Sequence, residues 1–338
     1  MRTIVGAAVR RPLAAARLRD CVRMQSLLDR RLIVVTGKGG VGKTTVAAAL
    51  GRLAARGGRR TTVVEVGGQS RAAELFGRAQ GEHGEPVGLE AGLSALSIDP
   101  DRALLEWVQA LGGRVPGRIL TSSGTFQYFA AAAPGAREIV TMIKIWRLAS
   151  AKRRSRGGGD LVIFDAPATG HALGMLRSPE TFSRIARVGP IVRDTGHVRE
   201  LLADPDRTAY VAVAQGTEMA VTETIELQQG LVDATGRELD AVVVNSLLPR
   251  RFSAQELERV EALGANGRRG PVAAAARAAR EVHARGGYQH SQVARLRRHG
   301  FEVLALPFVW TPALDLDELE VLVARLASGL EREPVGAT

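Results

Sequence analysis

Two lysines lie five residues apart in the glycine-rich segment TGKGGVGKTT, residues 36–45. From Gly37 to Thr44 the residues follow the spacing G-x-x-x-x-G-K-[ST], in which glycines let backbone N–H groups turn inward around phosphate oxygens. This pattern assigns the outer phosphates of a nucleoside triphosphate to Lys43 and a Mg²⁺ ion to the hydroxyl of Thr44. The pattern has no role for the second lysine, Lys38.

The surroundings of this loop also favour phosphate binding. The loop follows the apolar run RLIVVTG at 31–37, which predicts a strand, and it opens a predicted helix at 43–56. The start of a helix attracts anions, because its first N–H groups are unpaired and the helix dipole is positive there. We therefore expect a nucleoside triphosphate to be bound by Gly37, Gly39, Gly40, Val41, Gly42, Lys43 and Thr44.

A second candidate group lies in the segment DLVIFDAPATGH, residues 160–171. Its apolar residues predict a buried strand that ends in Asp165 at the sheet edge where the phosphate loop lies. A carboxylate there can hold the Mg²⁺ shell, usually through water, while Thr44 takes a direct position. An acid at the end of a strand is weak support by itself, since many such acids only cap the next turn. Together with the loop, Asp165 predicts a magnesium site.

Short β-branched runs alternate with longer helical patterns along the chain. This alternation predicts an α/β fold with a mostly parallel, doubly wound sheet and helices on both faces. We predict strands at 31–37, 60–66, 92–99, 160–165, 208–214, 239–245 and 301–307, and helices at 43–56, around 71–76 and at 102–111.

Two helical regions interrupt the alternation, at 112–150 and 252–298. We favour a helical layer packed on the core for the first region over a binding surface. No internal repeat is present, so we expect one nucleotide domain at 31–330, followed by a tail at 331–338. The C-terminal segment is amphipathic but acidic at its start, which predicts a packed helix rather than a membrane anchor.

The formal net charge of +11 would by itself suggest a nucleic-acid partner. Residues 1–31 hold eight arginines against two aspartates, so six of these charges lie at the N-terminus. We expect residues 1–30 to be a basic, disordered or partly helical extension, in preference to a transit peptide. Cys21 is the one cysteine, which excludes an intrachain disulfide and fits a cytoplasmic protein. No apolar run approaches the ~20 residues of a membrane-spanning helix, so we expect no stable membrane insertion.

Several motifs carry a family resemblance. GKGGVGKTT (37–45) resembles the deviant phosphate loop of the ATPases that include MinD, nitrogenase iron protein and the arsenical-pump (ArsA) ATPases, and DAPATGH (165–171) resembles the switch II motif of the ArsA branch. The resemblance covers about residues 31–328 and implies a P-loop NTPase fold. Further segments resemble ArsA-type sequences in the same order: SIDP (97–100), AAPGAREI (132–139), DPDRTAYVAVAQGTEMAVTETIEL (204–227), VVVNSLLP (242–249) and LPFV (306–309).

The resemblance implies a Mg²⁺-dependent ATPase that acts as a nucleotide-closed dimer, with itself or with a paralogue. In this family the extra lysine, here Lys38, reaches across the dimer interface to phosphates in the facing subunit, which couples hydrolysis to closure. The resemblance places Thr45 beside the inner phosphate, Asn245 against adenine, and Pro307 in a loop bordering adenine. It places Gly170 and His171 in the switch that follows the γ-phosphate, although by sequence alone His171 could equally be a plain helix-start residue.

One segment departs from the family pattern. After the second strand the family usually has D-P-A-H, whose Asp polarises the attacking water, whereas this chain has EVGGQS at 65–70. Glu65 could act there as a base and Gln69 could orient a water. We favour Glu65, because strand ends at this edge face the ligand, although an acid that caps a strand or helix end explains the residue about as well. Turnover is then expected to be slow or to depend on a partner.

The sequence disfavours several kinds of cargo. Arsenite recognition needs a cluster of cysteines, which Cys21 cannot supply. Delivery of tail-anchored membrane proteins needs a broad apolar groove, whereas residues 190–204 are short and polar and the chain has only five methionines. We expect no nucleic acid, since the arginine-rich region 250–298 is more simply a solvated face.

The sequence therefore predicts an ATPase that handles an unidentified protein partner or cargo. Two alternatives stay open. One is a non-catalytic nucleotide-binding subunit of a heterodimer, which the missing switch I Asp makes reasonable. The other is a MinD/ParA-like ATPase, whose ATP-driven dimerisation controls positioning on a membrane or on DNA.

Overall fold

The computed structural model of the chain describes residues 27–68, 70–81, 84–111, 135–151, 161–185, 190–265 and 270–330. The expectations for residues 1–26, Gln69, 112–134 and 331–338 concern parts of the chain that lie outside this description.

The described residues form one eight-stranded sheet in the order β3-β4-β2-β5-β1-β6-β7-β8, with β3 antiparallel to β4 and every other pairing parallel. The predicted α/β P-loop NTPase fold is confirmed. Each of the seven predicted strands is present and starts within two residues of its predicted start. The strands are β1 (Leu32–Gly37), β2 (Thr61–Val66), β3 (Val87–Glu90), β4 (Leu93–Ile98), β5 (Leu161–Ala168), β6 (Thr208–Gln215), β7 (Ala241–Leu247) and β8 (Val303–Pro307).

Strand β1 illustrates why such apolar runs form the sheet. Leu32 and Val34 are buried in the core on one face, and Ile33 and Val35 are buried in the core on the other. Successive side chains of a strand point to opposite faces, so a strand that is covered on both faces must be apolar throughout. Polar residues for chemistry are therefore expected toward the ends of such strands. Asp165 does not end its strand as predicted, because β5 continues for three residues beyond it, to Ala168.

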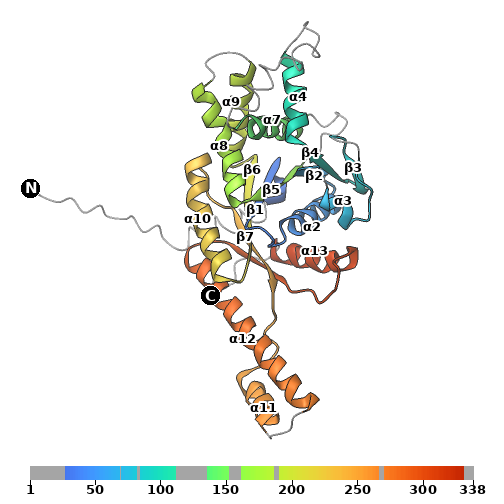
Figure 1. Cartoon of the computed structure of the whole chain (residues 1–338), viewed down its shortest axis with the longest axis vertical. Coiled ribbons are helices and arrows are strands. Elements are labelled where there is room, and N and C mark those ends of the chain that lie inside the picture. Colours follow the sequence, from blue (N-terminus) through green and yellow to red (C-terminus); the bar gives the residue numbers. More distant parts are fainter. Residues whose placement is uncertain are drawn as a thin grey trace, which may run out of the picture.

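Helices cover both faces of the sheet, as Figure 1 shows. Residues of α2, α3 and α13 belong to the core on one face, and residues of α4 and α7 to α10 belong to the core on the other. The helices are α2 (Lys43–Arg56), α3 (Arg71–Leu75), α4 (Pro100–Leu111), α7 (Ala136–Ser150), α8 (Thr169–Ile185), α9 (Pro190–Ala203), α10 (Glu218–Thr235), α11 (Ala254–Ala265), α12 (Pro271–Arg298) and α13 (Leu316–Leu330).

The two predicted helical regions differ in how they pack. In the first region, α7 buries Ile139, Ile143 and Ile145 in the core, which confirms a packed helical layer for the part that the structure describes. In the second region, α11 packs against α12, and α11 with the first part of α12 projects beyond the sheet (Figure 1). The last part of α12 packs on the sheet, where Val293 and Leu296 are buried in the core. No helix among the described residues is long and apolar enough to cross a membrane.

The described residues just before the predicted boundary at residue 31 pack against the domain. A 3-10 turn at Leu27–Asp29 places the side chain of Leu27 in the core, where it is 1% exposed. The guanidinium of Arg59 donates hydrogen bonds to the backbone carbonyls of Leu28 and Arg30. Residues 27–30 are thus part of the domain and not of a separate extension.

We predict that Leu27→Ala lowers the free energy of unfolding by about 2–4 kcal/mol, because truncating a buried leucine leaves a cavity. Leu105→Ala is the matched control, since this leucine is 45% exposed on α4 and its truncation is expected to cost no more than about 0.5 kcal/mol. Chemical denaturation of both variants measures the difference. Equal destabilisation by the two changes would contradict the placement of Leu27 in the core.

Candidate functional site

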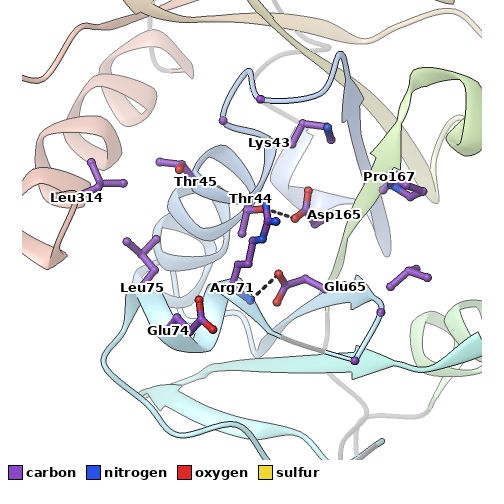
Figure 2. Close-up of a pocket in the computed structure, with 16 residues that line it drawn as sticks. Lys43, Thr44, Thr45, Glu65, Arg71, Glu74, Leu75, Asp165, Pro167 and Leu314 are labelled. Atoms are coloured by element: carbon purple, nitrogen blue, oxygen red, sulfur yellow. Dashed lines mark hydrogen bonds between the residues drawn. The ribbon is translucent and has the colours of Figure 1, made fainter.

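A cavity of about 910 Å³ lies at the carboxyl edge of the sheet, where β1, β2 and β5 end. Its size suits a nucleotide-sized ligand. Four segments line it: residues 40 and 42–45 of the phosphate loop and α2, residues 65–68, 71 and 74–75 around the start of α3, residues 165–167 of β5, and Leu314. Figure 2 shows the side chains that converge there.

Glycine is required at both ends of the phosphate loop. Gly37 has φ +143° and Gly42 has φ +93°, a region that favours glycine. A Cβ atom would lie 2.1 Å from the carbonyl oxygen of Val213 at Gly37, and 2.3 Å from Nδ2 of Asn245 at Gly42. Gly42 also precedes the first residue of α2, and no side chain caps that helix. The loop therefore presents the uncapped start of a 14-residue helix to the cavity, which is an anion-binding arrangement.

Lys43 is the first residue of α2 and lines the cavity. Its Nζ donates a hydrogen bond to the carbonyl oxygen of Lys38 at 3.1 Å, so the side chain folds back along the loop. Burial lowers the pKa of Lys43 from its ordinary value, while the nearby carboxylate of Asp165 opposes that shift. The loop thus holds an ammonium group beside the start of the helix, where phosphate oxygens would meet both.

Thr44 and Asp165 form the polar centre of the cavity. The hydroxyl of Thr44 donates to Oδ2 of Asp165 at 2.5 Å, the contact drawn as a dashed line in Figure 2. The other carboxylate oxygen, Oδ1, is buried and has no hydrogen-bond partner among the described residues. Burial raises the pKa of Asp165 to about 6, with a further contribution from the charge of Glu65.

These two side chains fit a magnesium ion. A hydroxyl and an unpaired carboxylate oxygen are hard ligands, and a cation beside them would relieve the cost of burying the charge of Asp165. No group of three or more His, Cys, Asp or Glu residues gathers as a metal site in the part of the chain that the structure describes. Mg²⁺ does not require such a group, because it usually binds one or two protein ligands together with waters and substrate phosphates.

The contacts of Glu65 are those of a helix cap. Its carboxylate accepts hydrogen bonds from the hydroxyl of Ser70 at 2.6 Å and from the backbone N–H groups of Arg71 and Ala72 at 3.0 and 3.2 Å. Burial raises the pKa of Glu65, and these hydrogen bonds oppose the rise. Both oxygens are thus engaged in holding the start of α3, which favours capping over a role as base. Gln69, the other candidate, is outside the description.

The side chain of Lys38 is engaged by another element of its own chain. Its Nζ forms an ion pair with Oε2 of Glu223 on α10 at 2.8 Å, and neither residue lines the cavity. The hydrogen bond from Lys38 lowers the pKa of Glu223. The two lysines of the loop therefore have different surroundings, since Lys43 faces the phosphate loop and Lys38 is held by a neighbouring helix.

The remaining predicted site residues divide into two groups. Thr45 lines the cavity, whereas Asn245, Gly170, His171 and Pro307 do not. Asn245 is buried, and its Nδ2 donates to the carbonyl oxygen of Val41 at 3.0 Å, so it fixes the loop from β7. Adenine contact by Asn245 and Pro307 stays a prediction, as does the switch role of Gly170 and His171.

Arg71, Glu74, Leu75 and Leu314 line the cavity but were not predicted from the sequence. No motif marks them. Arg71 had one available signal, since it follows the EVGGQS departure directly and begins a predicted helix at the sheet edge that holds the ligand. The direction of its side chain depends on how α3 is anchored, which the sequence pattern does not give.

Comparisons with known proteins identify the family. The family described as Anion-transporting ATPase matches residues 30–192. ATPase BagA of Mycobacterium tuberculosis is 31% identical over 243 residues, which cover 68% of each chain. The chain belongs to the anion-transporting ATPase family.

Other members of this ATPase family are more distant. The arsenical pump-driving ATPase of Escherichia coli is 29% identical over 232 residues, covering 63% of this chain and 39% of the pump ATPase. ATPase GET3 of Kluyveromyces lactis is 26% identical over 255 residues, covering 64% of this chain and 72% of GET3. The predicted family is thus confirmed, and membership of an ATPase family implies that the chain binds nucleotide.

We predict that Asp165→Asn stabilises the chain at pH 7.5 in the absence of nucleotide and divalent metal. The raised pKa of Asp165 means that the folded state binds this proton more tightly than the unfolded state. The resulting stability is present below the ordinary aspartate pKa and is lost as the pH rises through about 6. An uncharged side chain should therefore gain up to about 3 kcal/mol at pH 7.5 and almost nothing near pH 4.

Urea denaturation at the two pH values, with a chelator present, measures this difference. Asp233→Asn, a change of an exposed aspartate on α10, is the control and should alter the free energy of unfolding by no more than about 0.5 kcal/mol. An Asp165→Asn effect on the free energy of unfolding that is the same at both pH values would contradict a raised pKa of Asp165 in the folded state.

Proposed function

We propose that the chain is a Mg²⁺-dependent ATPase in which dimer closure is coupled to ATP hydrolysis. The observation that carries the proposal is the Thr44–Asp165 pair, which holds an unpartnered carboxylate oxygen beside Lys43 at the start of α2. This arrangement supplies, within one cavity, the groups that a magnesium-bound triphosphate needs. Family membership supports the same activity.

Each group has a definite task in this proposal. The amides at the start of α2 bind phosphate oxygens, and Lys43 leaves the carbonyl of Lys38 to hold the outer phosphates. Thr44 contributes its hydroxyl to Mg²⁺, and Asp165 holds the same ion directly or through a water. When bound, Mg²⁺ neutralises the charge that develops on the phosphate oxygens. Thr45 contacts the inner phosphate.

The proposal assigns Lys38 to the facing subunit of a dimer. In a single chain its ammonium group is engaged by Glu223, outside the cavity. Closure of two chains, identical or paralogous, would exchange this ion pair for phosphate oxygens across the interface. A cation that arrives only on closure makes hydrolysis depend on the dimer. The free energy of ATP hydrolysis would then be used to move or release an unidentified partner or cargo in the cytoplasm.

The contacts of Glu65 favour one alternative function. Because both of its oxygens cap α3, the carboxylate of Glu65 is not free to take a proton from water in the place of the family's switch I Asp. A chain of this kind could bind ATP and close without hydrolysing it. We retain a non-catalytic nucleotide-binding subunit of a heterodimer as the second candidate.

We predict that Lys38→Ala retains ATP binding but lowers turnover by roughly 100-fold or more, because a group that acts only in the closed dimer stabilises only the transition state. Lys43→Ala should weaken ATP binding itself, by about 10–100-fold. Equilibrium binding and steady-state ATPase assays with Mg²⁺ separate the two effects. A wild-type chain that binds ATP but turns over no faster than Lys43→Ala would reject hydrolysis and support the non-catalytic subunit.

We also predict that Glu223→Gln strengthens the ATP-dependent dimer, because it releases Lys38 from its own chain. The ion pair is partly exposed, with side-chain exposures of 39% for Lys38 and 29% for Glu223, so its loss should cost the monomer at most about 1 kcal/mol. A homodimer contains two such pairs, so its dissociation constant should then fall by up to about 30-fold. Analytical ultracentrifugation with ATP measures it, and Glu226→Gln on the exposed face of α10 is the control. A dimer that weakens on Glu223→Gln would contradict a restraining role.

A further inference from the structure

Arg71 lines the cavity, and a hydrogen bond of its backbone N–H fixes its position. It is the first residue of α3, and its N–H group donates to the carboxylate of Glu65, which fixes where the side chain starts. Figure 2 shows the side chain extending from α3 into the cavity toward Thr44 and Asp165. An arginine from the second strand–helix connection thus faces the proposed metal and phosphate groups.

The guanidinium of Arg71 has no counter-ion in the described part of the chain. No hydrogen bond or ion pair joins it to a described residue, and Glu74, which also lines the cavity, forms no ion pair with it. Its charge acts on the neighbouring groups nevertheless. Burial is the main influence on the pKa values of Lys43 and Asp165, and the charge of Arg71 further lowers the first and opposes the rise of the second.

An unpaired cation that faces an anion site has a clear chemical use. A guanidinium has five N–H donors in a planar arrangement that matches phosphate oxygens. Lys43 already occupies the side of the cavity next to the loop, whereas Arg71 approaches from α3. A ligand that contacts both must extend across the cavity, and a triphosphate carries one more phosphate and more negative charge than a diphosphate.

We propose that Arg71 binds the terminal phosphate of the nucleotide from within the same chain and thereby makes the site prefer ATP to ADP. This inference rests on the proposed function and adds a residue to it. Arg71 would mark the presence of the γ-phosphate at α3, next to the segment that lacks the family's switch I Asp. After hydrolysis the guanidinium would lose its ligand, so α3 would respond to the state of the nucleotide.

The substitution Arg71→Ala isolates this role. It removes the guanidinium but keeps the backbone N–H that bonds to Glu65. Alanine is the most favourable residue for a helix, and Arg71 is exposed, so no core cavity is created. Arg71→Lys retains the charge without the planar donors. Arg102→Ala is the matched control, because Arg102 is an exposed arginine on α4 that does not line the cavity.

The test is equilibrium binding of a slowly hydrolysed ATP analogue and of ADP, both with Mg²⁺, to the wild type and these variants. We expect Arg71→Ala to lose roughly tenfold or more of its affinity for the analogue and little for ADP. Arg71→Lys should lie between, and Arg102→Ala should match the wild type. Circular dichroism and urea midpoints confirm that each variant is folded.

Two failures can be told apart. If the wild type binds the analogue, Lys43→Ala weakens it, and Arg71→Ala keeps the wild-type ratio of the two affinities, the Arg71 inference is overturned while nucleotide binding stands. If the wild type binds neither nucleotide, the proposed function fails and the inference falls with it.

Discussion

The hydrogen bond between Thr44 and Asp165 joins the two halves of the site, and much of the fold serves to make it possible. It connects the first turn of α2 to β5, two elements 121 residues apart in sequence. Parallel pairing of β1 with β5 brings Val35 opposite Asp165, so the phosphate loop and the acid leave the sheet at one edge. The apolar layers on both faces hold that register. A buried carboxylate with one unpaired oxygen is costly, and a bound cation would offset that cost.

The phosphate loop is also tied to the other side of the sheet. Asn245 on β7 holds the carbonyl of Val41, and Glu223 on α10 holds Lys38. On the opposite wall of the cavity, the carboxylate of Glu65 on β2 accepts a hydrogen bond from the backbone N–H of Arg71, the first residue of α3. A ligand that displaces any of these contacts therefore acts on an element outside the cavity, which is the physical requirement for coupling nucleotide state to a partner.

The sequence predicted the parts of this arrangement that depend on local rules. Strands buried on both faces are long apolar runs, and a phosphate loop needs glycines at fixed spacing, so both were found with little error. Contacts set by packing were not found. The edge strand β3 is short and contains Gly88, the burial of Leu27 depends on a single side chain, and the partner of Lys38 lies 185 residues away. Glu65 was identified as a site residue, but its hydrogen bonds to the start of α3 could not be predicted, because they depend on how α3 is oriented relative to β2.

The most direct test of an active site completed by a second chain is ATP hydrolysis by a mixture of Lys38→Ala and Lys43→Ala chains, each assayed alone and then together. In a mixed dimer, the site with an intact Lys43 receives Lys38 from the other chain. A lysine that acts in trans predicts that mixing restores activity that neither variant shows alone. A mixture that stays as inactive as its two components, with an active wild type under the same conditions, would contradict a shared site.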